Sequence, residues 1–152
     1  MINKKEKLII GRKDKVDFPK LKLFNIDAKI DSGAFTSAIH CNNIRIKRRG
    51  EKRFVYFNLL DHSHPDYNHK EIRLPLHKIK MVKNSFGHSE RRYIVLTDII
   101  LFDQKYEIEL SLSDRTKMLH PVLLGRKLLK KEFIVDVSRV NLSYRQKMRK
   151  MN

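Results

Sequence analysis

The stretch Ala28-Lys29-Ile30-Asp31-Ser32-Gly33-Ala34 decides how this sequence is interpreted, because it places an acid at the end of an apolar strand, directly before a tight turn. From Phe24 onward, apolar and polar residues alternate up to Asp31, which predicts a half-buried strand. An acid in this position suits hydrolysis by a carboxylate pair, in which one carboxyl activates water and the other protonates the substrate carbonyl. Ser32 offers a hydroxyl that fixes the loop, and Gly33 leaves room for a close approach.

The same motif has a simpler interpretation. Asp-Ser-Gly is a common turn sequence, because Asp and Ser hydrogen-bond their own backbone and Gly permits the turn. Taken alone, the motif does not distinguish a catalytic acid from a structural turn.

A second segment, Pro121 to Leu129, predicts a short apolar strand that ends at Leu124, then Gly125, then an amphipathic helix. This is the one helix that the sequence predicts. Elsewhere the apolar residues recur mostly with period two, so the fold class is mainly β.

The two segments together resemble the signature of the retropepsins. In that family an acid loop and a later apolar–Gly–Arg–x–Leu–Leu unit form a crossed loop that holds the catalytic acid. The order is the same here, and the 94 positions between Asp31 and Gly125 exceed the separation in viral retropepsins.

The resemblance is closer still to a bacterial and archaeal branch, often labelled ATP-dependent zinc proteases and associated with RimK-type ATP-grasp glutamate ligases. The match extends from about Ile9 to Asn141 in six segments that keep their order. They are Ile9–Arg12, Ala28–Ala34 with Thr36–His40, Glu90–Ile94, Ser113–Met118, Leu123–Arg126 and Phe133–Asp136.

The resemblance implies an aspartic-type endopeptidase with a retropepsin-like, closed β-barrel and one short C-terminal helix. It implies that Asp31 is the catalytic acid, in an active-site loop formed by Ser32, Gly33 and Ala34. The supporting crossed loop would consist of Leu124, Gly125 and Arg126. A hairpin with strands around 72–82 and 93–101 would be the flap, with Gly87 near its tip, and residues 47–70 would be an insertion.

A symmetry argument extends this prediction. Acid proteolysis needs two carboxylates, and the chain has a single Asp-Ser/Thr-Gly motif. The second acid must therefore come from another copy, so the sequence predicts a two-fold homodimer that meets near Asp31.

Three positions depart from the family pattern. Ser32 replaces the Thr of many members and keeps the hydroxyl. Phe35 stands where viral enzymes have an acid that pairs with the Arg after the late Gly, so Arg126 needs another partner. The expected flap tip has one Gly, Gly87, rather than several.

Length, cysteine content and net charge indicate the number of domains, the cellular compartment and the kind of partner to expect. The 152 residues predict one domain, with a core of about 9–141 and a basic tail at 142–152 that is either frayed or an arm. Cys41 is the only cysteine, and no apolar run is long enough to span a bilayer, so we expect a soluble, cytoplasmic protein. The formal net charge of +17 favours polyanionic partners.

A zinc centre is the weaker chemical hypothesis. His62, His64 and His69 share one loop, but a polar, Pro-containing loop of this kind is more often simply solvated. No His-Glu-x-x-His helix and no phosphate-binding Gly-x-x-x-x-Gly-Lys-Ser/Thr loop is present, so we expect no cofactor.

Two classes of partner remain open. A peptidase with this charge would suit an acidic, glutamate-rich peptide substrate. The alternative is a non-catalytic basic β module that binds RNA, a ribosomal surface or acidic protein tails. Its support is the cluster of basic residues between Arg45 and Arg53, which is followed by Tyr56 and Phe57.

Overall fold

The fold is built from strands, as the period-two pattern predicts, and it closes on itself. In the computed structural model, which describes residues 6–152 except 62, 84–85 and 115–118, eleven strands, two α-helices and a short 3-10 helix, Pro19–Leu21, are present among the described residues. The strands are β1 Leu8–Ile10, β2 Lys13–Phe18, β3 Leu23–Ile30, β4 Ser37–Arg49, β5 Lys52–Leu59, β6 Glu71–Pro75, β7 Lys78–Lys83, β8 Ser89–Leu101, β9 Gln104–Ser113, β10 Val122–Leu124 and β11 Phe133–Val135. The helices are α1 Arg126–Glu132 and α2 Leu142–Met151.

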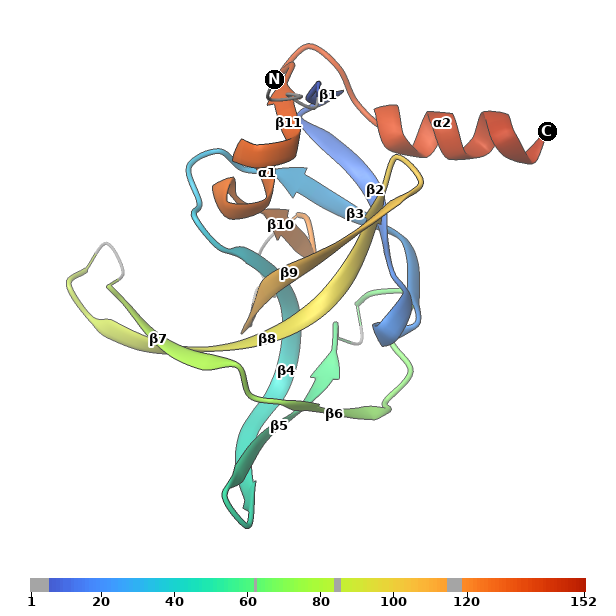
Figure 1. Cartoon of the computed structure of the whole chain (residues 1–152). Helices are drawn as coiled ribbons and strands as arrows, with labels where there is room; N and C mark the ends of the chain where they lie inside the picture. The colour runs from blue at the N-terminus through green and yellow to red at the C-terminus, as the bar shows by residue number, and fades with distance from the viewer. Residues whose placement is uncertain (1–5, 62, 84–85, 115–118) are drawn as a thin grey trace, which may run out of the picture.

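The short strand β10 closes the barrel. The order β10-β3-β2-β8-β9-β4 forms a ring, because β10 pairs with β3 in parallel and with β4 in an antiparallel sense. Closure removes free edges from these strands. The expected retropepsin-like barrel is therefore confirmed, and its closing strand is the one that leads into Gly125 (Figure 1).

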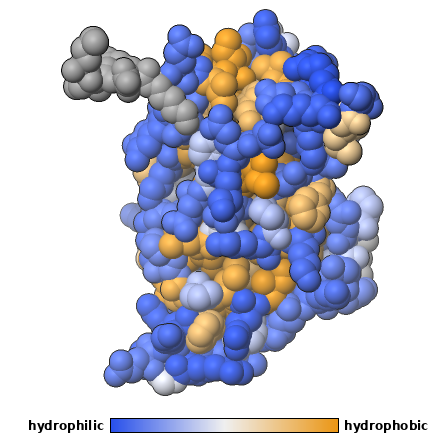
Figure 2. Space-filling model, turned by 45° about the vertical axis from the view of Figure 1, so that its right-hand side comes forward, coloured by the Kyte–Doolittle hydropathy of each residue, from blue (hydrophilic) through white to orange (hydrophobic). Residues whose placement is uncertain are grey.

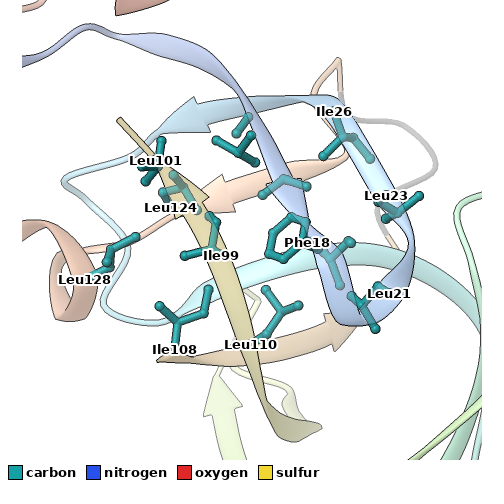
Figure 3. Packing of buried hydrophobic residues seen from close by; sticks show 14 of the residues in the cluster. Phe18, Leu21, Leu23, Ile26, Ile99, Leu101, Ile108, Leu110, Leu124 and Leu128 are labelled. Carbon is teal, nitrogen blue, oxygen red and sulfur yellow. The ribbon is translucent and has the colours of Figure 1, made fainter. Parts of the chain in front are cut away.

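The barrel interior is filled by apolar side chains from both ends of the sequence. Figure 3 shows Phe18, Ile26, Ile99, Leu110 and Leu124 converging inside the ring. All five are almost completely buried, and each fully buried side chain of this size contributes roughly 1.5–3 kcal/mol to folding. This packing fixes β3 and β10 relative to each other, and with them the loops that follow.

The segment 142–152 is a helix rather than a frayed end. The carboxylate of Asp14, on β2, accepts the backbone N–H groups of Ser143 at 2.9 Å and of Tyr144 at 3.1 Å. Burial raises the pKa of Asp14, although these amides and that of Lys15 act in the opposite direction. The structure therefore has a second α-helix, α2, beyond the one that the sequence predicts. Its first turn is capped by Asp14, which lies near the other end of the chain.

The region after β5 also differs from the expected plan. Residues Glu71–Pro75 were expected to open the flap hairpin, but they form β6 and pair with β5 instead. The flap hairpin is shorter, with β7 Lys78–Lys83 paired to β8. Among the described residues, no helix is both long and apolar enough to cross a membrane.

Candidate active site

Asp31 lies where the sequence predicts, directly after β3 and beside the end of β10. Its backbone N–H donates to the carbonyl of Leu124 at 2.9 Å, which continues the β3–β10 pairing by one residue. Its Oδ1 accepts the N–H of Gly33 at 3.0 Å, so the side chain also stabilises its own turn. The other oxygen, Oδ2, accepts no hydrogen bond within the described part of the chain. The side chain is partly exposed, so one oxygen remains available to water or substrate.

The crossed loop forms because α1 begins against the acid loop. The backbone N–H of Arg126 donates to the carbonyl of Ala34 at 2.8 Å, and that of Lys127 donates to Phe35 at 3.0 Å. These first-turn amides have no partner inside a helix, and here the acid loop satisfies them. The structure thus brings together the two segments that the sequence singled out.

Gly125 is required by the close approach of the two segments. A Cβ built on this residue would lie 2.7 Å from the Phe35 carbonyl oxygen and 2.9 Å from that of Ala34. Its N–H donates to the Ser37 hydroxyl at 3.1 Å. Both obstacles are backbone atoms, so they cannot turn away as a flexible side chain could.

Arg126 interacts with a backbone carbonyl and an aromatic ring instead of the acid that viral enzymes have at the position of Phe35. Its guanidinium donates to the carbonyl of Ser32 at 2.9 Å and lies 5.7 Å from the centre of the Phe35 ring. The ring face attracts the cation in place of a carboxylate. Arg126 therefore still connects the helix to the active-site loop.

A cavity of about 480 Å³ lies between the acid loop and β7. Ala34, Phe35 and Thr36 line one side, and residues 80–83 of β7 line the other. Lys80 reaches across it, with its Nζ 5.0 Å from the centre of the Phe35 ring. Strand β7 thus stands opposite the acid loop, as a flap strand would.

The cavity is bordered by cations. Lys83 and Arg92 line it together with Lys80. Lys130, on α1, lies 5.7 Å from the Phe35 ring, on which Arg126 also packs. Several like charges around one opening produce a local positive potential that attracts anions.

Gly87 lies in the turn between β7 and β8, with a positive φ of 81° and an exposed backbone. Positions 84–85 of the same turn fall outside the described residues. The expected tip position of Gly87 agrees with this geometry, and its role in flap closure stays a prediction.

The structure adds a partly buried cluster of charged and polar side chains that the sequence did not indicate. Glu109, on β9, accepts contacts from Lys127 of α1 at 2.7 Å, from Lys78 at 3.0 Å and from His77 at 3.1 Å. Burial alone would raise the pKa of Glu109, but the hydrogen bonds from Lys127, Lys78 and His77 lower it to about 2. The cluster joins the root of the flap to the helix that holds the acid loop. Glu109, Lys127 and the His77–Lys78 pair lie far apart in sequence, so no sequence motif predicts the cluster.

The histidine loop does not assemble as a zinc site in the part of the chain that the structure describes. His62 lies outside the described residues. The Nδ1 of His64 accepts the N–H of Asp66 at 3.1 Å, and His69 packs edge-on against Tyr67 with ring centres 4.4 Å apart. Among the described side chains, no group of three or more His, Cys, Asp or Glu is placed to hold a metal ion.

His40 and Cys41, which follow the acid loop, have structural surroundings. His40 is buried, and its Nε2 is hydrogen-bonded to Asp61. The Ser63 hydroxyl and N–H lower the pKa of Asp61 to about 2, with a smaller contribution from His40. Burial raises the pKa of the Cys41 thiol to about 12, so it is not a nucleophile at neutral pH.

A family model described as RimB-like, the retropepsin-like aspartic endopeptidase RimB, matches residues 9–146. Curated relatives carry the name "Probable alpha-L-glutamate ligase". The protein of Shewanella pealeana is 40% identical over 137 residues, and that of Parasynechococcus marenigrum is 33% identical over 134 residues. These alignments cover 87% and 86% of the chain, but only 29% and 28% of the relatives. The chain thus spans less than a third of the length of these proteins.

A solved structure has the same fold. It is a protein of unknown function from Legionella pneumophila, with a TM-score of 0.71 and 23% sequence identity. The superposition covers 91% of this chain and 99% of that one. At this identity the likeness concerns the fold alone.

Proposed function

The chain belongs to the RimB-like family of retropepsin-like aspartic endopeptidases, and from that membership we propose that it hydrolyses peptide bonds as a homodimer, with Asp31 of each copy supplying one carboxylate. The observation that carries the proposal is the placement of Asp31. Its carboxylate stands on a partly exposed turn that backbone hydrogen bonds hold to β10 and α1, and the residues that follow this turn, Ala34–Thr36, line a cavity that faces β7.

The mechanism follows from two such acids that share one proton. The ionised carboxyl of the pair takes a proton from water, whose oxygen bonds to the substrate carbonyl carbon. The protonated carboxyl gives its proton to the carbonyl oxygen, and the carbon–nitrogen bond then breaks as the amine takes up a proton. Because the two acids are coupled, the pair titrates with two macroscopic pKa values rather than one for each residue.

The crossed loop has a positioning role in this mechanism. The backbone hydrogen bonds from Arg126 and Lys127 to the acid loop restrict the turn in which Asp31 stands. A carboxylate that must meet its two-fold copy at hydrogen-bonding distance requires such a rigid support.

We further propose that the substrate is an acidic, glutamate-rich peptide. The support is the set of cations at the cavity, which includes Lys80, Lys83 and Arg92. Glutamate side chains would be attracted to this edge and would bring the chain of the substrate across Asp31. The curated relatives are named as glutamate ligases, which is a statement about those proteins, and it agrees with a glutamate-containing substrate. The single, buried Cys41 fits a cytoplasmic setting.

A second candidate is a module without catalysis that binds acidic protein tails. The names of the curated relatives favour it, because those proteins are named probable ligases rather than peptidases and the chain corresponds to less than a third of each. In that case the same cations would bind the tail, and Asp31 would only stabilise its turn.

One experiment separates the two candidates. The purified chain is incubated with a synthetic peptide that ends in four glutamates and with its glutamine counterpart, and products are identified by mass spectrometry. A peptidase cleaves the glutamate peptide, and Asp31→Asn abolishes the cleavage. A module binds the glutamate peptide without cleaving it, and Asp31→Asn leaves the affinity unchanged. Sedimentation of the same samples tests the dimer.

A further inference from the structure

The outer part of the β4–β5 hairpin projects from the barrel. Pairing between β5 and β6 ends at Phe54 opposite Pro75, whereas β4 and β5 continue through Arg48–Arg53 to Arg49–Lys52. The hairpin therefore ends as a two-stranded ribbon, which extends at the lower end of the molecule, away from α1 and the acid loop (Figure 1). In Figure 2 this lower end is covered mainly by hydrophilic residues.

The ribbon carries most of its cations in register on one face, while Arg48 and Arg53 form a row on the other. Alternate residues of a strand point to the same side, and cross-strand partners share that side. Arg45 lies opposite Tyr56, which lies opposite Arg73 on β6, and the next rows pair Lys47 with Phe54 and Arg49 with Lys52. We call this set the basic face; its cations are Arg45, Lys47, Arg49, Lys52 and Arg73.

Aromatic rings support the cations of the basic face. The Nζ of Lys47 lies 4.8 Å from the centre of the Tyr56 ring, and the guanidinium of Arg73 lies 4.9 Å from that of Phe54. Tyr56 is only 8% exposed. The rings are thus covered by the cations and are not available for stacking on bases. Their effect is to hold positive charges at the surface.

The charge of the hairpin is poorly compensated. Among the described residues, Glu71 forms an ion pair with Arg45, and no ion pair is present for Lys47, Arg48, Arg49, Lys52 or Arg53. Like charges on neighbouring strands repel one another and oppose folding. The acids near these cations are Glu51 in the turn and Glu71 on β6, so most of the positive charge is left for an external polyanion to compensate.

The spacing of the charges fits one phosphodiester strand. Side chains on the same face of a strand are about 7 Å apart, and neighbouring strands are about 5 Å apart. The basic face is two to three strands wide, so its cations can follow a single phosphodiester backbone. Arginine predominates in the hairpin, and its planar fork suits phosphate.

We propose that the basic face of the β4–β5 hairpin binds the backbone of single-stranded RNA, independently of sequence. The contacts are electrostatic, because cations lie over the aromatic rings that could otherwise stack on bases. The site lies apart from Asp31, so it does not depend on the proposed peptidase activity.

The test compares two variants that carry the same change in net charge. The first is the triple variant Lys47→Glu, Arg49→Glu, Lys52→Glu, on the basic face near the end of the ribbon. The control is Lys105→Glu, Lys131→Glu, Arg149→Glu, at exposed positions outside the hairpin. A 20-nucleotide oligouridylate is the probe, and its binding is measured by fluorescence anisotropy at 50 and 200 mM salt. Thermal unfolding checks that each variant folds. If the first one does not fold, the three substitutions to Gln replace it.

For the unmodified chain, affinity should fall roughly 100-fold between the two salt concentrations if about five phosphates are neutralised. The hairpin variant should bind at least about 30-fold more weakly at 50 mM salt and should show a shallower salt dependence. The control should remain within about three-fold of the unmodified chain. Equal losses in both variants, or stronger competition by duplex DNA or polyglutamate than by oligouridylate, would overturn the proposal.

Discussion

Arg126 and Ser32, which are 94 positions apart in sequence, are joined by a hydrogen bond of 2.9 Å from the guanidinium to the backbone carbonyl. The bond joins the first residue of α1 to the turn that carries Asp31. We therefore expect Arg126→Ala to lower the kcat of peptide hydrolysis about ten-fold and to change KM less, because the acid loop loses a restraint rather than a substrate contact. Stability should fall by about 1 kcal/mol.

Lys131→Ala is the matched control for this variant, since Lys131 is an exposed residue on the same helix. It should leave both kinetic constants unchanged. An Arg126→Ala enzyme with an unchanged kcat would show that the acid loop does not need this restraint.

Asp31→Asn should abolish hydrolysis while leaving the fold intact. The amide keeps an oxygen that can accept the N–H of Gly33, but it cannot take a proton from water. The expected loss is between about 100- and 10,000-fold. Hydrolysis assays and sedimentation velocity are the measurements. Ser32→Thr, which keeps the hydroxyl at an exposed position, should remain within a few-fold of the unmodified chain.

Gly125→Ala should destabilise the protein by about 2–3 kcal/mol, because the new methyl group would overlap the backbone of Phe35 and Ala34. Urea unfolding measures the loss. Gly50→Ala is the control that separates steric overlap from backbone conformation. Gly50 has a φ of 64°, but no atom lies within 4 Å of the added Cβ. Its cost should be about 1 kcal/mol, from backbone conformation alone. Equal losses at the two positions would contradict the close-packing explanation.

The Glu109 cluster predicts an acid-dependent loss of stability. The pKa of Glu109 in the folded state is about 2, below its ordinary value of 4.5. A depressed folded-state pKa stabilises the protein above pH 4.5, and this contribution disappears as the pH falls from about 5 to 2. Glu109→Gln should therefore cost about 1–3 kcal/mol at pH 7, less than half of that at pH 3, and little below pH 2.

Urea unfolding of both proteins across this pH range is the measurement. The two unfolding free energies should converge as the pH falls. A difference that stays constant with pH would mean that the cluster stabilises the fold through packing rather than charge.

Asp14→Ala should loosen α2. The variant removes the acceptor for the amides of Ser143, Tyr144 and Lys15, and leaves buried donors without partners. The expected cost is about 2–4 kcal/mol, with faster amide exchange in α2. Asp27→Ala, which breaks an exposed ion pair with Lys15, should cost less than about 0.5 kcal/mol. Unchanged exchange in α2 would contradict the capping role of Asp14.

The sequence predicts well those features that depend on local pattern. The alternation that ends at Asp31 and the apolar–Gly–helix unit at Leu124–Arg126 lie where the periodicity indicates, and Phe35 is correctly marked as requiring a new arrangement for Arg126. The single domain of 1–152 and the dimer stay predictions. Part of one resembling segment, 115–118, lies outside the described residues.

Features that depend on distant partners could not be predicted in the same way. Residues Glu71–Pro75 have an ordinary strand pattern, but nothing local says whether β5 or β8 is their partner. Segment 142–152 has no acid of its own with which to begin a helix, and its capping group, Asp14, is 129 positions away. The Glu109 cluster likewise collects residues from three separate elements.

The late position of β10 has a consequence for how the protein folds while it is being synthesised. Strand β3 leaves the ribosome early, but its barrel partner is made about ninety residues later, which takes about 5–20 s at ordinary elongation rates. Throughout that interval one edge of β3 and the apolar interior behind it lack their cover. Slow translation of the middle of the chain would prolong this exposure. Chaperone dependence and aggregation during expression should therefore respond to codon choice upstream of Val122 more than to codon choice after it.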